Sequence, residues 1–377
     1  MAQRLKTDWI LFFTIIAMVC FGLVLVYSAS SVMAELKFNG DMYFITRQLG
    51  WAAVSFLALM QLKRLDYRRF DNPVWAFAPL GIVTSLLVLV YFVGYKHRWL
   101  QLGPASLQPS EFAKPALIIF LAYFIALRLK RINDKYTIRP AMLALGGVAA
   151  MVVGPDLGTA IVLVLTAAIL FYIAGLERRY IAAATIAGVI LVGIAVIAKP
   201  YRLSRVLAIF DPQFTLVDIV NPGGEIRNYV KRAQNNDPKY QPLQSRVAVG
   251  SGGVLGVGLM QSRQKLLYLP EAHTDYIYAV IGEELGLWGA SGVLFGFFII
   301  LWRGLRLFYL APDNFGRYLA LGVTVSIVVQ ALVNISVVLD IGPTKGIPLP
   351  MISYGGSSLL STLISLGLLL SVSEHAG

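Results

Sequence analysis

Charge and cysteine are both scarce in this chain of 377 residues. Only 14% of the residues are charged and 57% are hydrophobic, a balance that a water-soluble domain of this length does not show. Cys20 is the only cysteine and lies within an apolar run, so an internal disulfide is excluded and the redox compartment stays undetermined. These shortages indicate a polytopic helical membrane protein.

Long apolar runs make up most of the chain. The first, Trp9–Tyr27, follows Arg4 and Lys6 and resembles a secretory signal, but it is long enough to span a bilayer and is interpreted as a retained first helix. The other runs cover residues 44–62, 74–95, 112–128, 140–153, 157–176, 180–198, 276–302, 315–341 and 356–372. The sequence therefore predicts an all-α polytopic membrane protein with about ten transmembrane helices, in a single domain over residues 1–377.

The placement of the basic residues predicts which ends of these helices face the cytoplasm. The segment 140–153 is short for a membrane crossing, and its omission would exchange the sides of every later loop. With ten crossings and a cytoplasmic N-terminus, the short outer loops hold only Lys37, Arg47, Lys96, Arg98 and Lys345, and the larger basic clusters face inward. Both termini are therefore expected in the cytoplasm. The excess of 32 basic over 20 acidic residues is mainly a topology signal, and nucleic-acid binding is not expected.

One connection, residues 199–272, is long and polar and is predicted to be an extracytoplasmic loop between helices seven and eight. Its first half is dense in turn-forming Pro, Gly and Asn. Its second half contains GSGGVLGVGL, which could suggest a phosphate-cradling loop, but the flanking strand and helix that such a motif needs are missing. A flexible or tightly packed surface segment is the favoured interpretation.

The stretch Gln264–Gly286 gathers the ionisable residues Glu271, His273, Asp275, Glu283 and Glu284. Pro270 ends whatever precedes it, and Thr274 is placed to cap the following apolar helix. Asp275 is then either a first-turn acid that complements the helix dipole or a carboxylate held at a membrane boundary to take a proton. Glu283 and Glu284 are the alternative bases if Asp275 only caps the helix.

Four polar groups interrupt the apolar pattern, and the ten-helix topology places all of them at the outer face. They are Gln108–Glu111 with Lys114, Gly154–Asp156, His273–Asp275, and Pro343–Ser358. Because irregular backbone at membrane depth must be buried in protein or line a cavity, we expect these groups to converge on one extracytoplasmic site at the mouth of a cavity.

Two pairs of polar residues lie within the predicted helices near this face. Glu111 and Lys114 are three residues apart and share a helix face, which predicts a buried ion pair that either only tolerates burial or also presents Lys114 to a phosphate. Gln330 and Asn334 are one turn apart and are expected to hydrogen-bond across helices.

Several stretches resemble the signatures of one family over almost the whole chain, in matching order and spacing. They are RWLQLGPASLQPSEFAKPALI (98–118), PDLGTA (155–160), SRVLAIFDP (204–212), QSRVAVGSGGVLGVGL (244–259), LPEAHTDYIYAVIGEELG (269–286) and PTKGIPLPMISYGGSS (343–358). The chain is similar to the SEDS (shape, elongation, division and sporulation) family, and closer to its division-type members. Residues 214–239 resemble an insertion, and Met260-Gln261 replaces an expected glycine-rich pair, so both departures bear on partner docking or substrate contacts.

This resemblance implies a peptidoglycan glycosyltransferase that polymerises lipid II at the outer face of a bacterial cytoplasmic membrane, for septal wall synthesis. Asp275 matches the family's essential aspartate and is expected to be the catalytic base. The candidate substrate-binding residues are Glu111, Lys114, Arg246, Lys265, His273, Lys345 and Ser353, of which the four cations suit a departing pyrophosphate. A divalent metal remains open. The implied partners are a class B penicillin-binding protein transpeptidase and other divisome proteins.

Two other functions stay open on the residues alone. A lipid II flippase would also need polar groups inside a helical bundle, but at both faces or at the midplane, whereas here they gather at one face. A non-catalytic scaffold for a transpeptidase would need exposed loops but no buried Asp275.

Overall fold

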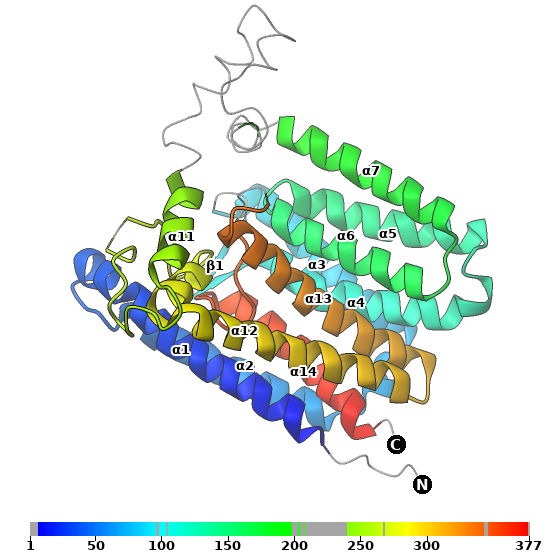
Figure 1. The fold of residues 1–377 in the computed structure, drawn as a ribbon. Coiled ribbons are helices and arrows are strands. Elements are labelled where there is room, and N and C mark those ends of the chain that lie inside the picture. Colours follow the sequence, from blue (N-terminus) through cyan, green and yellow to red (C-terminus); the bar gives the residue numbers. More distant parts are fainter. Residues whose placement is uncertain are drawn as a thin grey trace, which may run out of the picture.

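The computed structural model describes residues 7–95, 98–102, 105–197, 203, 207, 240–266, 268–342 and 346–375. In this part of the chain the fold is a bundle of long helices (Figure 1). The helices that coincide with the predicted runs are α1 (Trp9–Phe38), α2 (Tyr43–Arg64), α3 (Pro73–Val93), α4 (Pro109–Arg128), α5 (Lys135–Val153), α6 (Leu157–Ile173), α7 (Arg178–Ile197), α12 (Ile277–Leu310), α13 (Asn314–Val338) and α14 (Gly356–His375). The predicted all-α polytopic membrane fold is confirmed.

Length and composition make α1, α3, α4, α5, α12, α13 and α14 suitable for crossing a membrane, and α6 is a shorter apolar helix. The residues 140–153 belong to α5, which starts earlier at Lys135, so the chain turns between two full helices at Gly154. Polar side chains set several helix starts, because Asp8, Asn72, Asp134, Asp156 and Asp313 each accept a hydrogen bond from a first-turn backbone N–H.

Short elements outside the predicted runs complete the described fold. Helix α11 (Tyr240–Ser251) precedes the glycine-rich segment, and 3-10 turns follow α2 and α4 as η1 (Tyr67–Phe70) and η2 (Leu129–Arg131). A small antiparallel hairpin, β1 (Leu100–Leu102) and β2 (Ala105–Leu107), leads into α4 and pairs Leu100 with Leu107. Each strand of the hairpin has only three residues, which is too short for an alternating apolar and polar pattern to be recognised in the sequence.

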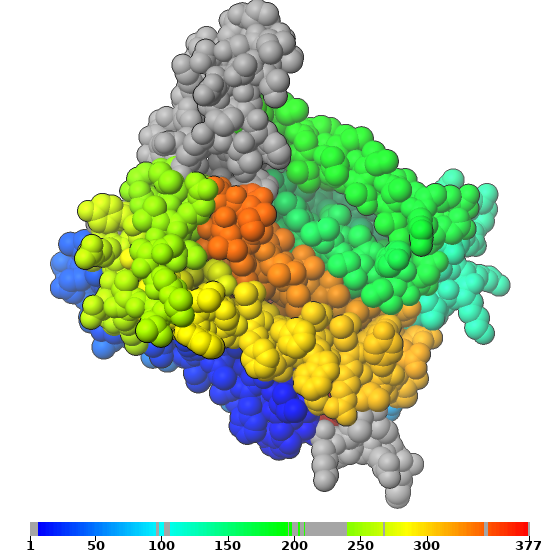
Figure 2. Space-filling model, viewed as in Figure 1, coloured from blue at the N-terminus to red at the C-terminus, as the bar shows by residue number. Residues whose placement is uncertain are grey.

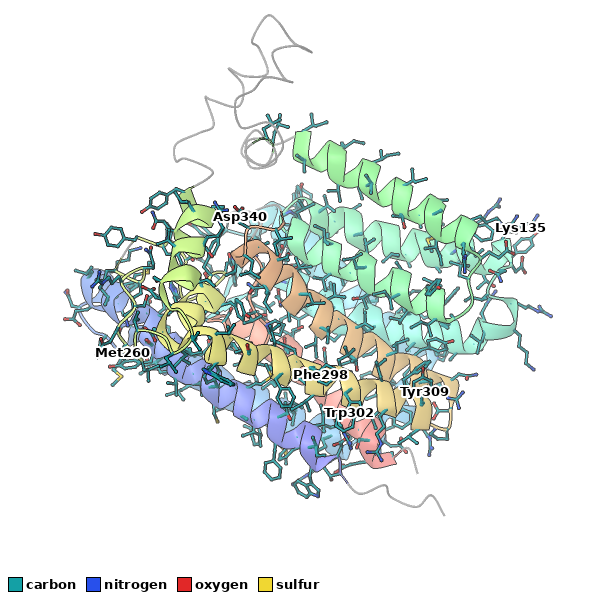
Figure 3. The ribbon with its side chains drawn as sticks, in the orientation of Figure 1. Lys135, Met260, Phe298, Trp302, Tyr309 and Asp340 are labelled. Atoms are coloured by element: carbon teal, nitrogen blue, oxygen red, sulfur yellow. The ribbon has the colours of Figure 1, made fainter. Side chains whose placement is uncertain are left out.

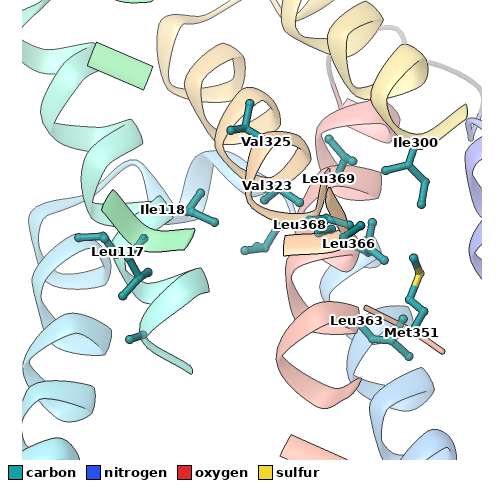
Figure 4. Packing of buried hydrophobic residues seen from close by; sticks show 14 of the residues in the cluster. Leu117, Ile118, Ile300, Val323, Val325, Met351, Leu363, Leu366, Leu368 and Leu369 are labelled. Carbon is teal, nitrogen blue, oxygen red and sulfur yellow. The ribbon is translucent and has the colours of Figure 1, made fainter. Parts of the chain in front are cut away.

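Helices α4, α13 and α14 form the centre of the bundle, where most of their side chains are buried. Figure 4 shows Leu117 and Ile118 of α4, Val323 of α13 and Leu366 of α14 in this core. Small residues let the helices approach closely, and a Cβ added at Gly367 of α14 would lie 3.0 Å from the backbone oxygen of Leu59 in α2.

Different residues and segments lie at the two ends of the bundle. Figure 3 places Lys135 and Tyr309 at one end of the helices and Met260 and Asp340 at the other. Both termini of the chain lie toward the Lys135 and Tyr309 end in Figure 1. At the opposite end, α11 and the segment after it cover the start of α12 in Figure 2. All four predicted polar groups are at this covered end or next to it, as their contacts show below.

Helix α12 is broken at Gly286, where φ is 61° and ψ is −155°. The break receives the glycine-rich segment: Leu287 N–H donates to Gly253 O, and the carbonyls of Glu283 and Glu284 accept from the N–H groups of Val257 and Gly258. A Cβ at Gly252 or Gly256 would lie about 2 Å from the carbonyl oxygens of α12 (1.9 and 2.2 Å). The tightly packed alternative predicted for this segment is therefore confirmed.

Replacing Gly286 by Ala is expected to lower the free energy of unfolding by about 1–3 kcal/mol, because this backbone region is accessible almost only to glycine. The new Cβ would also lie 2.4 Å from the backbone N of Gly256. Gly292→Ala is the matched control, since it lies on the exposed face of the same helix with open space around it. Thermal unfolding of both variants in detergent measures the difference, and equal midpoints would contradict the packing described here.

Candidate active site

Asp275 lies in a tight turn directly before α12. Glu271 has a positive φ of 58°, and its carbonyl accepts from the N–H groups of Thr274 (3.2 Å) and Tyr276 (3.3 Å). The expected capping role of Thr274 is wrong: α12 begins at Ile277 without a side-chain cap, and the Thr274 hydroxyl donates to Glu271 instead. Asp275 is half-buried and lies before the first turn of the helix rather than in it.

The irregular segment 346–355 packs against this turn. Gly346 is so close that a Cβ built on it would lie 1.5 Å from Asp275 Oδ2, so only glycine leaves room for the carboxylate. Asn334 of α13 joins the two segments, because its Nδ2 donates to Asp275 O (2.8 Å) and to Ile347 O (2.6 Å). Asn334 was predicted to hydrogen-bond across helices, but both acceptors lie in non-helical segments, so it holds the backbone of the candidate base instead.

Ser353 and His273 complete the junction of the two segments. The Ser353 hydroxyl donates to Thr274 O (2.5 Å) and accepts from Leu349 N–H (2.8 Å), and Tyr354 N–H donates to His273 O (3.0 Å). Ser353 is buried, and these two backbone bonds occupy its hydroxyl. The predicted substrate-binding residue Ser353 therefore lies at the site as part of its framework.

The His273 ring is buried between aromatic rings, with centroids 4.6 Å from Phe44 and 5.6 Å from Tyr354. Burial lowers the pKa of His273, because the apolar surroundings penalise the imidazolium form; Glu271 opposes this shift. A neutral ring that packs against two aromatics anchors the turn.

Glu111 and Lys114 form the predicted ion pair, with 2.7 Å between Lys114 Nζ and Glu111 Oε2, and both side chains are buried. Lys114 also donates to Gln330 Oε1 (2.6 Å), and Gln330 Nε2 donates to Pro348 O (2.8 Å). The pair therefore supports the segment 346–355 through Gln330.

The group at Gly154–Asp156 joins the same end of the bundle. Asp156 is buried and accepts from Gln108 Nε2 (2.7 Å) and from Arg98, whose Nη2 lies 3.2 Å away. Ser357 Oγ in turn accepts from Gln108 N–H (3.1 Å). These contacts connect all four predicted polar groups at one end of the bundle. That this end is extracytoplasmic and opens into a cavity stays a prediction.

The remaining predicted cations lie farther from this junction. Lys265 is buried in an ion pair with Glu284 (2.9 Å), beside Ser28 of α1, so its charge serves to hold the glycine-rich segment on α12. Arg246 of α11 is exposed, and its Nε lies 3.4 Å from Asp340 at the end of α13. Lys345 lies outside the described residues, as do residues 204–206, 208–212 and 214–239.

Sequence reasoning missed two residues of the site. Gln48 of α2 donates to Ser353 O (3.3 Å) and accepts from Gly355 N–H (3.2 Å), and its only signal was an amide inside an apolar run. Gly346 lies within the predicted group Pro343–Ser358, but nothing in the sequence singled it out from the other glycines there. In the described part of the chain no group of three or more His, Cys, Asp or Glu side chains gathers as a metal site would require.

The arrangement provides one half-buried carboxylate on a turn that is fixed by backbone hydrogen bonds on two sides. Such a carboxylate can accept a proton from a hydroxyl group brought to it. Asn334 and Ser353 position this turn through its backbone, because they donate to Asp275 O and Thr274 O.

Comparison with known proteins extends these observations to the whole chain. Residues 8–377 match the family model of FtsW, RodA and SpoVE, described as "Cell cycle protein". The probable peptidoglycan glycosyltransferase FtsW of Trichlorobacter lovleyi is 38% identical over 97% of this chain and 93% of its own. Stage V sporulation protein E of Bacillus subtilis is 35% identical over 99% of both chains.

Two solved structures have the same fold over 98% of both chains. One, from a study of how a peptidoglycan synthase complex coordinates polymerization and crosslinking, has a TM-score of 0.75 at 28% identity. The other, the rod shape determining protein RodA of Thermus thermophilus, has a TM-score of 0.66 at 26% identity. With a family match across the described bundle and full-length relatives above 30% identity, this chain belongs to the FtsW, RodA and SpoVE family, the SEDS family.

Proposed function

We propose that this chain is a peptidoglycan glycosyltransferase that polymerises lipid II, with Asp275 as the catalytic base. The observation that carries the proposal is the half-buried Asp275 carboxylate at the junction of four polar groups. The names of the full-length relatives, probable peptidoglycan glycosyltransferases, support the reaction class.

In this reaction the 4-hydroxyl of a GlcNAc unit attacks the anomeric carbon of the growing chain. The new C–O bond forms as the bond from the anomeric carbon to the pyrophosphate oxygen breaks, and undecaprenyl pyrophosphate leaves with the electron pair. Asp275 takes the hydroxyl proton, a contribution of about 10²–10⁴-fold for a well-placed base. The exposed Arg246, together with Lys345, is proposed to stabilise the departing pyrophosphate, while Lys114 supports the site through Gln330.

The proposed topology places the Asp275 end of the bundle outside the cytoplasmic membrane and both termini in the cytoplasm. It is supported by the basic clusters at the end that carries the termini. In a Cys20→Ala background, Gln261→Cys is expected to react with a membrane-impermeant thiol reagent in intact cells, and Lys135→Cys only after permeabilisation. Both positions are exposed in the structure. Reaction of the Lys135 variant in intact cells would overturn the topology.

A transpeptidase of the class B penicillin-binding protein type is the proposed partner, and septal wall synthesis the proposed role. The solved structure from a peptidoglycan synthase complex supports the partner, and the FtsW-named relatives support the septal role.

The exposed surface of α11 and the segment after it is the proposed docking region for this partner, because the apolar side chains of Leu243, Val254 and Leu255 are exposed there.

Polymerisation by the purified full-length chain tests the function. The chain is incubated with lipid II in detergent, alone and together with its co-purified transpeptidase, and glycan strands are separated on gels. Strands are expected in at least the second reaction. A flippase or a scaffold would give strands in neither, and that outcome would refute the proposed activity.

A further inference from the structure

A basic cavity lies at the end of the bundle that carries the termini, far from the Asp275 junction. It has a volume of about 510 Å³ and is lined by residues 126–131, where α4 passes into η2, and by Asn314 at the start of α13. This volume is within the range of about 300–1,000 Å³ that is usual for small-molecule sites. Three cations, Arg128, Lys130 and Arg131, contribute to its wall, and all three are exposed.

Several other basic residues at the same end of the bundle form ion pairs with carboxylates, which these three cations do not within the described part of the chain. Lys63 pairs with Glu374, Arg68 with Asp313, Arg179 with Glu177 and Arg303 with Asp8. Among the described residues no carboxylate pairs with Arg128, Lys130 or Arg131.

The neighbouring carboxylates are already engaged in holding helix starts. Asp313, next to the cavity residue Asn314, accepts from Tyr67 and caps α13, and Asp134 caps α5. Three like charges around one cavity repel each other, and a bound anion would relieve that repulsion. The first turn of α13 adds the positive end of a helix dipole beside Asn314.

The surroundings of the cavity indicate what kind of anion would reach it. Leu127, which also lines the cavity, is 66% exposed and lies at the end of a membrane-spanning helix. A ligand at this position therefore meets cations on one side and the hydrocarbon of the bilayer on the other. We propose that the cavity binds the phosphodiester headgroup of an anionic phospholipid in the leaflet at the termini, with its acyl chains along α4.

Retention of lipid by the purified full-length chain tests this proposal without any measurement of turnover. The chain in detergent is offered equal amounts of phosphatidylglycerol and phosphatidylcholine with identical acyl chains, and bound lipid is counted by native mass spectrometry. Selective retention of phosphatidylglycerol is expected. The triple variant Arg128→Gln/Lys130→Gln/Arg131→Gln is expected to lose roughly a hundredfold in affinity, since each cation near an anionic lipid contributes a factor of about five.

Two further variants separate the cavity from net charge. Arg64→Gln/Arg178→Gln/Arg306→Gln removes the same charge from exposed arginines at the same end and is expected to retain phosphatidylglycerol. Asn314→Trp keeps every charge but places an indole ring in the cavity and is expected to weaken retention of the lipid. Unfolding midpoints equal to that of the parent chain show that each variant is folded.

Three outcomes would overturn the proposal. Equal retention of both lipids by the parent chain would mean that the cavity does not select an anion. Equal losses in the two triple variants would mean that only net charge attracts the lipid. Displacement by glycerol 3-phosphate at the same concentration would mean that a soluble phosphate, without acyl chains, is the ligand.

Discussion

Glycan-strand formation is expected to fall by about a hundredfold or more when Asp275 is replaced by Asn, because the amide cannot accept the hydroxyl proton at neutral pH. Asn has nearly the same shape as Asp, so the close approach of Gly346 is tolerated. The hydrogen bond from Asn334 goes to the backbone carbonyl of residue 275 and does not depend on the side chain. The fold is therefore expected to remain intact while turnover is lost.

Glu271→Gln is the matched control for this variant. Its carboxylate lies in the same turn but is exposed, and a Gln oxygen still accepts from the Thr274 hydroxyl. The control is expected to form strands at the parent rate in the same gel assay. Near-normal strands from Asp275→Asn would show that Asp275 is not the base. Glu283 and Glu284 would then be poor substitutes, because they accept from Ser262 and pair with Lys265, respectively.

The second large effect is expected at the buried pair of Glu111 and Lys114. Either single change to Ala strands the opposite charge inside the bundle, which is expected to lower the free energy of unfolding by roughly 3–5 kcal/mol. The double change to Met removes both charges at similar volume and is expected to recover most of this loss. Gln330 would then lose its donor from Lys114, so about 1–3 kcal/mol should remain missing.

Chemical unfolding of the parent, both single variants and the double variant in detergent measures this coupling. Turnover is expected to stay low in the double variant, because Gln330 and the carbonyl of Pro348 are no longer held by Lys114. Recovery of stability without recovery of turnover separates the two roles of the pair. If the losses of the two single changes simply add in the double variant, the residues are not energetically coupled.

The helices could be predicted from the sequence because burial in a bilayer leaves continuous apolar runs. The pair of Glu111 and Lys114 could also be predicted, since a spacing of three residues fixes their neighbourhood on one helix. The third partner, Gln330, could not, because it is 216 residues away along the chain. The capping role of Thr274 was predicted wrongly for a similar reason: residue type indicates that Thr274 can cap a helix, but not that Glu271 occupies its hydroxyl.

The candidate site, too, could be predicted only in part from the sequence. Its polar groups were visible as interruptions of apolar runs, and charge placement assigned them to one face. How these groups contact one another depends on backbone atoms such as Thr274 O and Ile347 O. Every residue type has such atoms, so these contacts cannot be predicted from the sequence. The functional assignment of Asp275 came from family resemblance, and the structure adds the framework around it. Lys345 and residues 214–239 lie outside the described residues.

The junction between the glycine-rich segment and the break in α12 has a consequence for comparative sequence work. Val257 and Gly258 donate to backbone oxygens of Glu283 and Glu284. A Cβ at Gly256 would meet backbone atoms of Glu284 and Gly286 in α12. A side chain added on either side has no opposite side chain whose trimming would restore the fit. Compensating pairs of substitutions should therefore be rare here, so methods that infer contacts from correlated changes among homologues are expected to overlook this junction even though it is closely packed.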